Sequence, residues 1–138
     1  MHSSGYSGTP LARKLGLKDG FTVRLVNAPP YYWDLFTDIP QNLKILDRAT
    51  RDLDLVHLFA TNTTALHQGL PACMKQIKPD GIIWVSWPKK ASGVVTDITE
   101  DTIRAFALDI GLVDVKVCAV DATWSALKLV IPVKRRTQ

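Results

Sequence analysis

The stretch that decides the fold is residues 82–96, which read Ile-Ile-Trp-Val-Ser-Trp-Pro-Lys-Lys-Ala-Ser-Gly-Val-Val-Thr. Its first six residues form a nearly continuous apolar run, which is typical of a strand buried on both faces of a parallel sheet. Pro88 ends this run and keeps the preceding Trp87 extended. A basic loop that contains glycine follows. We therefore expect the chain to build a sheet around this strand and to return to it afterwards.

The length and composition are those of a single globular domain. With 138 residues, 46% of them hydrophobic and 22% charged, the chain can bury a core without metals or disulfides. No stretch reaches the roughly 18 apolar residues of a membrane span, and residues 1–8 lack the regions of a signal peptide. We expect a flexible N-terminus at 1–8, one α/β domain at 9–133 and a basic tail at 134–138, in a cytoplasmic protein without membrane contact.

The charge and the cysteines argue against several kinds of site. The net charge of +4 comes partly from the tail, and the basic residues lack the interleaved aromatic residues of a nucleic-acid-binding face. Nucleic acid is therefore not an expected partner. Cys73 and Cys118 have no Cys-x-x-Cys spacing, and no two histidines or cysteines are spaced as metal ligands. We expect two reduced core thiols and no metal site.

Apolar periodicity and turn residues predict strands that alternate with helices. The predicted strands are residues 21–27, 43–46, 55–59, 82–87, 113–120 and 124–133. The predicted helices are residues 9–16, capped by Thr9, residues 63–77, and a helix that begins at Asp97 or Thr99 and ends near 109. Gly69 and Pro71 predict a kink or break in the second helix, and residues 78–81 a turn. A short helical or irregular piece is expected at 31–36.

This order predicts a three-layer α/β domain with central parallel strands and helices on both faces of the sheet. The turn at 121–123 is too short to return a parallel strand, so the last two strands form an antiparallel hairpin. The link at 47–54 is shorter than a helical crossover, so it must cross the end of the sheet in extended form.

Several of these segments resemble the second half of class I methyltransferases. The strand Asp-Leu-Val-His-Leu-Phe at 54–59, the helix after it and Ile-Lys-Pro-Asp-Gly at 77–81 match a strand, a helix and a "leucine-lysine-proline-glycine-glycine" turn of that family. The terminal hairpin is similar too. Asp47 stands about twenty residues after the first strand, where such enzymes hold a ribose. The resemblance implies a Rossmann-like, methyltransferase-like fold across residues 21–133.

The first strand, however, ends differently from that family. A glycine-rich loop should follow it, but the chain has Asn27-Ala28-Pro29-Pro30. Glycine lets a backbone approach a cofactor closely, whereas proline supplies no amide hydrogen and fixes its own φ. We therefore predict no cofactor, and no binding of S-adenosylmethionine or a dinucleotide in the usual way.

The chain as a whole resembles a family of small bacterial proteins with no assigned function. The segments that carry the resemblance are Tyr-Ser-Gly-Thr-Pro-Leu at 6–11, Val-His-Leu-Phe at 56–59, Trp-Val-Ser-Trp-Pro-Lys-Lys at 84–90 and Val-Lys-Val-Cys-Ala-Val at 115–120. This resemblance implies no activity.

Open α/β sheets bind ligands at the carboxyl ends of their strands. Residues that follow those ends are candidates for binding a small anionic ligand: Asn27, Asp47, Trp87, Lys89, Lys90 and Ser92. The lysines would supply charge, Asn27 and Asp47 orientation, Ser92 a hydroxyl and Trp87 a wall. Each also has a plainer interpretation, as a solvated lysine, a turn residue or a packed ring.

A second hypothesis is a non-catalytic interaction module on the same scaffold, with another protein or a second copy of the chain as partner. It rests on the aromatic segment at 31–36, which could be an exposed patch, a lid or a small core beneath a loop. His57 lies within an apolar strand, where a buried, hydrogen-bonded side chain is the expected role. Neither hypothesis assigns a reaction.

Overall fold

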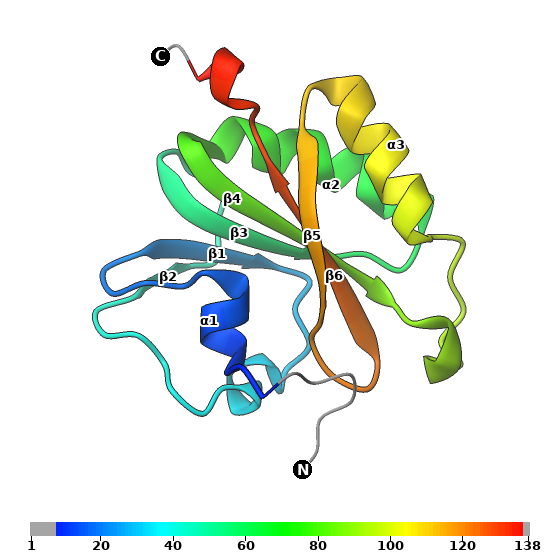
Figure 1. Ribbon diagram of the computed structural model, residues 1–138, viewed down its shortest axis with the longest axis horizontal. Helices are drawn as coiled ribbons and strands as arrows, with labels where there is room; N and C mark the ends of the chain where they lie inside the picture. Colours follow the sequence, from blue (N-terminus) through cyan, green and yellow to red (C-terminus); the bar gives the residue numbers. More distant parts are fainter. Residues whose placement is uncertain (1–7, 137–138) are drawn as a thin grey trace.

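Six strands form one mixed sheet in the order β2-β1-β3-β4-β6-β5 (Figure 1). The structure is a computed structural model and describes residues 8–136. The strands are β1 (Thr22–Val26), β2 (Lys44–Leu46), β3 (Leu53–Phe59), β4 (Ile77–Pro88), β5 (Val113–Ala119) and β6 (Trp124–Val130). The helices are α1 (Leu11–Leu15), α2 (Thr63–Gln76) and α3 (Glu100–Ile110), with the 3-10 turns η1 (Tyr32–Leu35), η2 (Lys90–Ser92) and η3 (Val133–Arg135).

The predicted strand that organises the chain is β4, and it lies inside the sheet. It pairs in parallel with β3 on one side and antiparallel with β6 on the other, and β5 pairs antiparallel with β6. Strands β2, β1 and β3 are parallel to one another. The predicted mixed α/β sheet with its terminal antiparallel hairpin is therefore confirmed.

Helices cover both faces of the sheet. Figure 1 shows α1 in front of the sheet and α2 behind it. Along β4, Val85 and Trp87 pack in the core that contains residues of α2 and α3, whereas Trp84 packs in the core that contains residues of α1. The indole nitrogen of Trp84 donates to the carbonyl of Leu15 at 2.8 Å, which fixes α1 on the sheet. This two-sided burial explains why the strand reads as a continuous apolar run.

The turn predicted at residues 78–81 is instead an irregular part of β4. Ile77 pairs with Leu53 and Ile82 with Leu55, so residues 78–81 of β4 lie opposite the single residue Asp54 of β3. Gly81 permits this crowding, because an added Cβ would lie 2.8 Å from the Cβ of Ile77 and 3.0 Å from the carbonyl oxygen of Leu53. The sequence predicted an interruption at residues 78–81, but it did not predict that β4 already pairs with β3 before it, at Ile77.

One predicted helix cap is wrong, and for another helix one of two predicted alternatives is confirmed. Pro10, not Thr9, occupies the N-cap of α1 and provides no side-chain hydrogen bond. In α3 the N-cap is Thr99, whose hydroxyl accepts from the amide of Thr102 in a reciprocal capping box. Asp97 is drawn away from this role because its carboxylate accepts from the amide of Thr63 at 2.9 Å.

Pro71 does not divide α2, which runs unbroken from Thr63 to Gln76. A proline inside a helix costs about 3 kcal/mol. Leu66, Leu70 and Cys73 bury one face of the helix in the core, and burial of such side chains contributes about 1.5–3 kcal/mol each. Packing therefore outweighs the local penalty.

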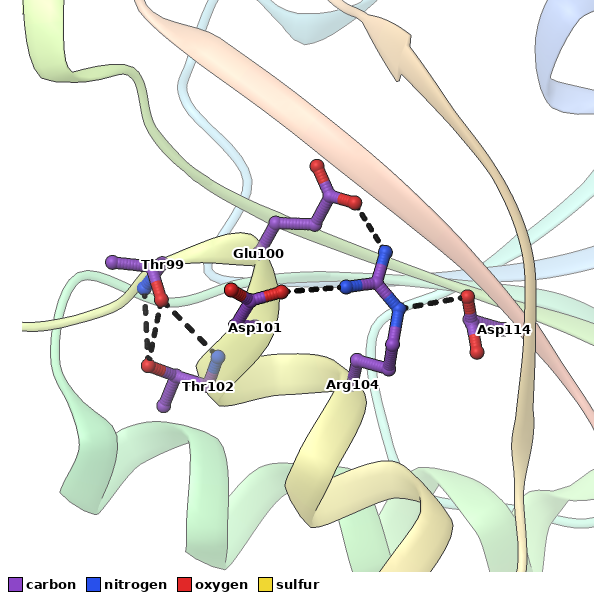
Figure 2. A network of polar contacts seen from close by, with 6 residues as sticks. All are labelled: Thr99, Glu100, Asp101, Thr102, Arg104 and Asp114. Atoms are coloured by element: carbon purple, nitrogen blue, oxygen red, sulfur yellow. Dashed lines mark hydrogen bonds and ion pairs between the residues drawn. The ribbon is translucent and has the colours of Figure 1, made fainter.

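Arg104 joins α3 to β5 (Figure 2). Its Nε donates to Asp114 at 2.9 Å and its Nη1 to Asp101 at 2.7 Å, and Nη2 pairs with Glu100. The Arg104 guanidinium lowers the pKa of Asp114, mainly through this hydrogen bond. The network holds the end of the sheet against the helix that covers it.

The connections agree with the sequence in part. Residues 47–52 cross from β2 to β3 without a helix, as predicted.

The described part of the basic tail contains η3, and Arg136 donates to the carbonyl of Ile131 at 2.7 Å. Most of the predicted flexible N-terminus, and residues 137–138 of the tail, lie outside the described residues. Within residues 8–136, no helix has the length and apolarity needed to cross a membrane.

Candidate functional site

The residues predicted from the carboxyl ends of the strands do not meet at one point. Asn27 is exposed directly after β1 with a left-handed φ of 59°, and Asp47 is exposed after β2. Strand β3 lies between β1 and β4, so Asn27 and Lys89 stand about two strand spacings apart, or about 10 Å. Asp47, at the edge of the sheet, is one spacing farther from Lys89. Trp87 is only 8% exposed and packs in the core.

The loop after β4 is fastened to the hairpin. The amide of Lys89 donates to the carbonyl of Thr123 at 2.7 Å, which places the loop beside the turn between β5 and β6. The hydroxyl of Ser92 donates to the carbonyl of Lys89 at 2.7 Å and accepts from the amide of Val94 at 3.2 Å. Ser92 therefore stabilises the loop itself, and the side chain of Lys90 is exposed.

The N-terminus of α2 opens at the point where the strand order reverses, which is the usual ligand position in such sheets. Here the chain's own side chains occupy it. Asn62 accepts from the amide of Ala65 at 2.8 Å, and Asp97 accepts from both the amide and the hydroxyl of Thr63. An incoming anion would have to displace the Asp97 carboxylate.

A chain of three polar side chains crosses the α1 side of the core. The Tyr32 hydroxyl lies 2.9 Å from Nδ1 of His57, and Nε2 of His57 lies 2.7 Å from the hydroxyl of Ser86. All three side chains are buried. Burial lowers the pKa of His57 to about 3 and raises the pKa of Tyr32. His57 is thus neutral and satisfied on both nitrogens, as the strand pattern predicted, and none of the three can reach a substrate.

The aromatic segment at 31–36 is a small core beneath a loop. Tyr32 is buried and packs edge-on against Trp33 and Phe59, with ring centroids 4.9 and 5.8 Å apart. Tyr31 is 37% exposed, and burial together with a hydrogen bond to Asp121 raises its pKa. This contact links the loop after β1 to the hairpin turn. The segment provides internal packing and no broad aromatic patch.

A strongly charged concavity lies between α1 and the hairpin, and we call it the basic groove. It has a volume of about 570 Å³. Its described lining includes three cationic side chains and no carboxylate: Thr9, Arg13, Lys14, Lys116, Val117, Cys118, Ala119 and Ser125. Ser125 pairs with Trp87 of β4, so the groove lies near the carboxyl end of the parallel strands.

The cations of the basic groove are not neutralised by ion pairs within the described residues. Within residues 8–136, none of Arg13, Lys14 and Lys116 forms an ion pair. Lys14 donates to the carbonyl of Ala119 at 3.3 Å, which leaves its charge uncompensated. Burial raises the pKa of the Cys118 thiol, and Lys14 and Lys116 oppose that shift, so both amines act on this thiol.

Sequence reasoning missed the basic groove because its residues come from segments about a hundred positions apart. A second concavity, of about 530 Å³, lies on another side of α1 and is lined by Arg13 and Lys18 but also by Asp19 and Asp38. Its charges are mixed, so the basic groove is the better anion site.

Comparisons with solved structures support the fold. The chain superposes on a "possible exported protein" from Bordetella parapertussis with a TM-score of 0.56 and 12% identity, over 88% of this chain and 65% of that one. It superposes on a SAM-dependent O-methyltransferase from Thermotoga maritima with a TM-score of 0.55 and 9% identity, over 93% of this chain and 65% of that one. With a NADB-Rossmann superfamily protein from Streptococcus agalactiae the TM-score is 0.53 and the identity 8%, over 93% of this chain and 70% of that one.

These likenesses establish a methyltransferase-like, Rossmann-like fold for the chain, and at such identities they establish the fold alone. The chain spans about two thirds of the length of the structures it matches. No protein-family model and no curated protein sequence matches it. The resemblance to a family of small bacterial proteins and the cytoplasmic location therefore stay predictions.

Proposed function

We propose that the chain is a binding domain for a small anionic ligand and that the basic groove is its main site. The observation that carries the proposal is the gathering of Arg13, Lys14 and Lys116 around one concavity whose described lining holds no carboxylate. Cations held together without acidic partners repel one another, and a bound anion would relieve that repulsion. The lining hydroxyl of Thr9 adds a donor for anionic oxygens.

The site differs from the one predicted from the sequence, although both lie toward the carboxyl end of the sheet. Lys89 and Lys90 leave β4 beside the hairpin turn and are not among the residues that line the basic groove. Asn27 and Asp47 stand on the far side of β3 and are not among the residues that line the basic groove. Trp87 packs in the core and presents no open surface to a ligand.

The end of β1 does not fit S-adenosylmethionine or a dinucleotide. Such ligands are held by backbone amides at a glycine loop and a helix N-terminus. Pro29 and Pro30 have no amide hydrogen to offer, and the carbonyl of Pro29 accepts from Tyr32 at 3.0 Å to begin η1. Only a 3-10 turn, η1, stands where a long helix would begin. We therefore assign no cofactor and no methyl transfer to the chain.

The experiment is isothermal titration calorimetry with inorganic phosphate and with a short acyl carboxylate, on two double variants of equal charge loss. Arg13→Ala with Lys116→Ala should weaken anion binding about tenfold or more, a loss of about 1.4 kcal/mol. Lys89→Ala with Lys90→Ala should leave it within about twofold. Equal binding by the first variant and the unmodified protein would refute the basic groove as the site. Absence of binding by the unmodified protein would refute the function.

A further inference from the structure

We infer that the ligand of the basic groove carries a chain of several phosphoryl groups rather than one anionic group; this inference rests on the function proposed above. Its basis is a further cation, Lys128 of β6, that lies directly opposite Lys116 and extends the charge of the groove onto the neighbouring strand. Three observations support it: a bulge that turns Lys116, the pairing of Lys116 with Lys128, and the length over which the cations extend.

The bulge lies in β5. Asp114 pairs with Leu129 of β6, but Lys116 pairs with Lys128, so Val115 is an extra residue in the ladder. Asp114 and Lys116 would share a face in a regular strand. The bulge separates them: Asp114 reaches Arg104 beside α3, whereas Lys116 lines the groove on the side of α1. Bulges commonly re-aim a side chain next to a functional site.

Lys116 thereby comes to lie directly opposite Lys128. Like charges at directly opposed positions destabilise a sheet. Burial lowers the pKa of Lys128, and Lys116 and then Lys18 add to that effect. Within residues 8–136, no carboxylate forms an ion pair with Lys18, Lys116 or Lys128. The fold therefore places two like charges, Lys116 and Lys128, directly opposite each other at one end of the groove.

The cations are anchored over a length of strand greater than the width of one phosphate. Lys14 is bound at Ala119, three residues along β5 from Lys116, which corresponds to about 10 Å of strand. Lys116 and Lys128 lie at one end of this distance, and Arg13 and Lys14 at the other. A linear string of phosphoryl groups can contact both ends at once, with each amine as a point charge on a phosphate oxygen.

The test compares phosphate, tripolyphosphate and ATP on the unmodified protein, on Lys128→Met and on the control Lys75→Met. Methionine keeps most of the apolar length of lysine, and Lys75 is exposed on α2, which covers the opposite face. Tripolyphosphate should bind about tenfold or more tighter than phosphate. Lys128→Met should remove most of that advantage while leaving phosphate binding within about twofold, and Lys75→Met should change neither.

A second measurement needs no substitution. Cys118 lies in the groove and Cys73 is 1% exposed, so iodoacetamide should modify Cys118 selectively. Tripolyphosphate should slow this alkylation at concentrations where phosphate does not. Equal binding of tripolyphosphate and ATP would place recognition in the phosphate chain, in agreement with the inference. ATP binding without tripolyphosphate binding would overturn it.

The outcomes separate the two proposals. If phosphate binds in the basic groove but tripolyphosphate binds no tighter, or if Lys128→Met and Lys75→Met behave alike, the polyphosphate inference fails and the anion site stands. If neither anion binds and neither protects Cys118, both fail.

Discussion

Nε2 of His57 lies 2.7 Å from the hydroxyl oxygen of Ser86, on an adjacent strand and with no access to solvent. The resemblance to a catalytic serine–histidine pair is only geometric. Nδ1 of His57 is hydrogen-bonded to Tyr32, and all three side chains are buried away from solvent. Its role is to satisfy polar groups that the sheet has buried. This role can be measured as stability.

Ser86→Ala should destabilise the protein by about 1–3 kcal/mol, because Nε2 of His57 loses its only partner in a buried setting. Urea unfolding followed by circular dichroism measures the change. Ser92→Ala, which removes a half-buried hydroxyl from a surface loop, is the control and should cost less. Equal costs for the two variants would contradict a buried network.

Acid should destabilise the fold through His57. Its pKa is about 3 when folded and near 6.5 when unfolded, so the unfolded chain binds the proton more readily. Stability is therefore fully present above pH 6.5 and is lost as the pH falls toward 3, by up to about 1.4 kcal/mol per pH unit. The measurement is the difference in unfolding free energy between the protein and His57→Phe across pH 4–7. A difference that does not vary with pH would refute this assignment.

Gly81→Ala should destabilise the protein by about 1–3 kcal/mol, because its Cβ would contact the fixed Cβ of Ile77 and the backbone of Leu53. Gly69→Ala is the matched control. There the new Cβ meets only the flexible end of Leu58 at 3.1 Å, and alanine favours the helix by about 1 kcal/mol. Thermal unfolding should therefore show a lower midpoint for the first variant and little change for the second.

Two threonines distinguish a working cap from an apparent one. Thr99→Ala should cost about 1 kcal/mol, because it removes the capping box of α3. Thr9→Ala should leave the free energy of unfolding almost unchanged, because α1 begins at Leu11 and its N-cap, Pro10, provides no side-chain hydrogen bond. Chemical denaturation of the two variants side by side tests this, and a larger loss from Thr9→Ala would contradict the observed helix start.

Much of the fold could be predicted because it depends on local patterns. The apolar run of β4, the short turn before β6 and the stop at Gly111 determine a buried strand, an antiparallel hairpin and a helix end from neighbouring residues alone. The wrong cap at Thr9 and the alternative cap at Asp97 came from the same local patterns. Asp97 has the right spacing to Glu100, but it bonds to Thr63, a partner that appears only when α2 and the loop before α3 meet.

The candidate site was less predictable for the same reason. Lys89 and Lys90 are candidate ligand residues because they follow a strand, and that position can be recognised from one segment of the sequence. Arg13, Lys14 and Lys116 are joined only by the packing of α1 on the hairpin, and no spacing in the chain relates them. The position of Lys116 depends further on a single unpaired residue, Val115, which no periodicity in the strand reveals.

That unpaired residue offers a way to remove the bulge without moving either charge. With Val115 deleted, the alternation of β5 would be regular, and Asp114 and Lys116 would become neighbours that project from opposite sides of the sheet. The strand would then keep its acid beside Arg104 and its base opposite Lys128. A shortened chain should therefore fold with both contacts intact, and a change in its anion binding would be due to the lost twist of the bulge rather than to a misplaced lysine.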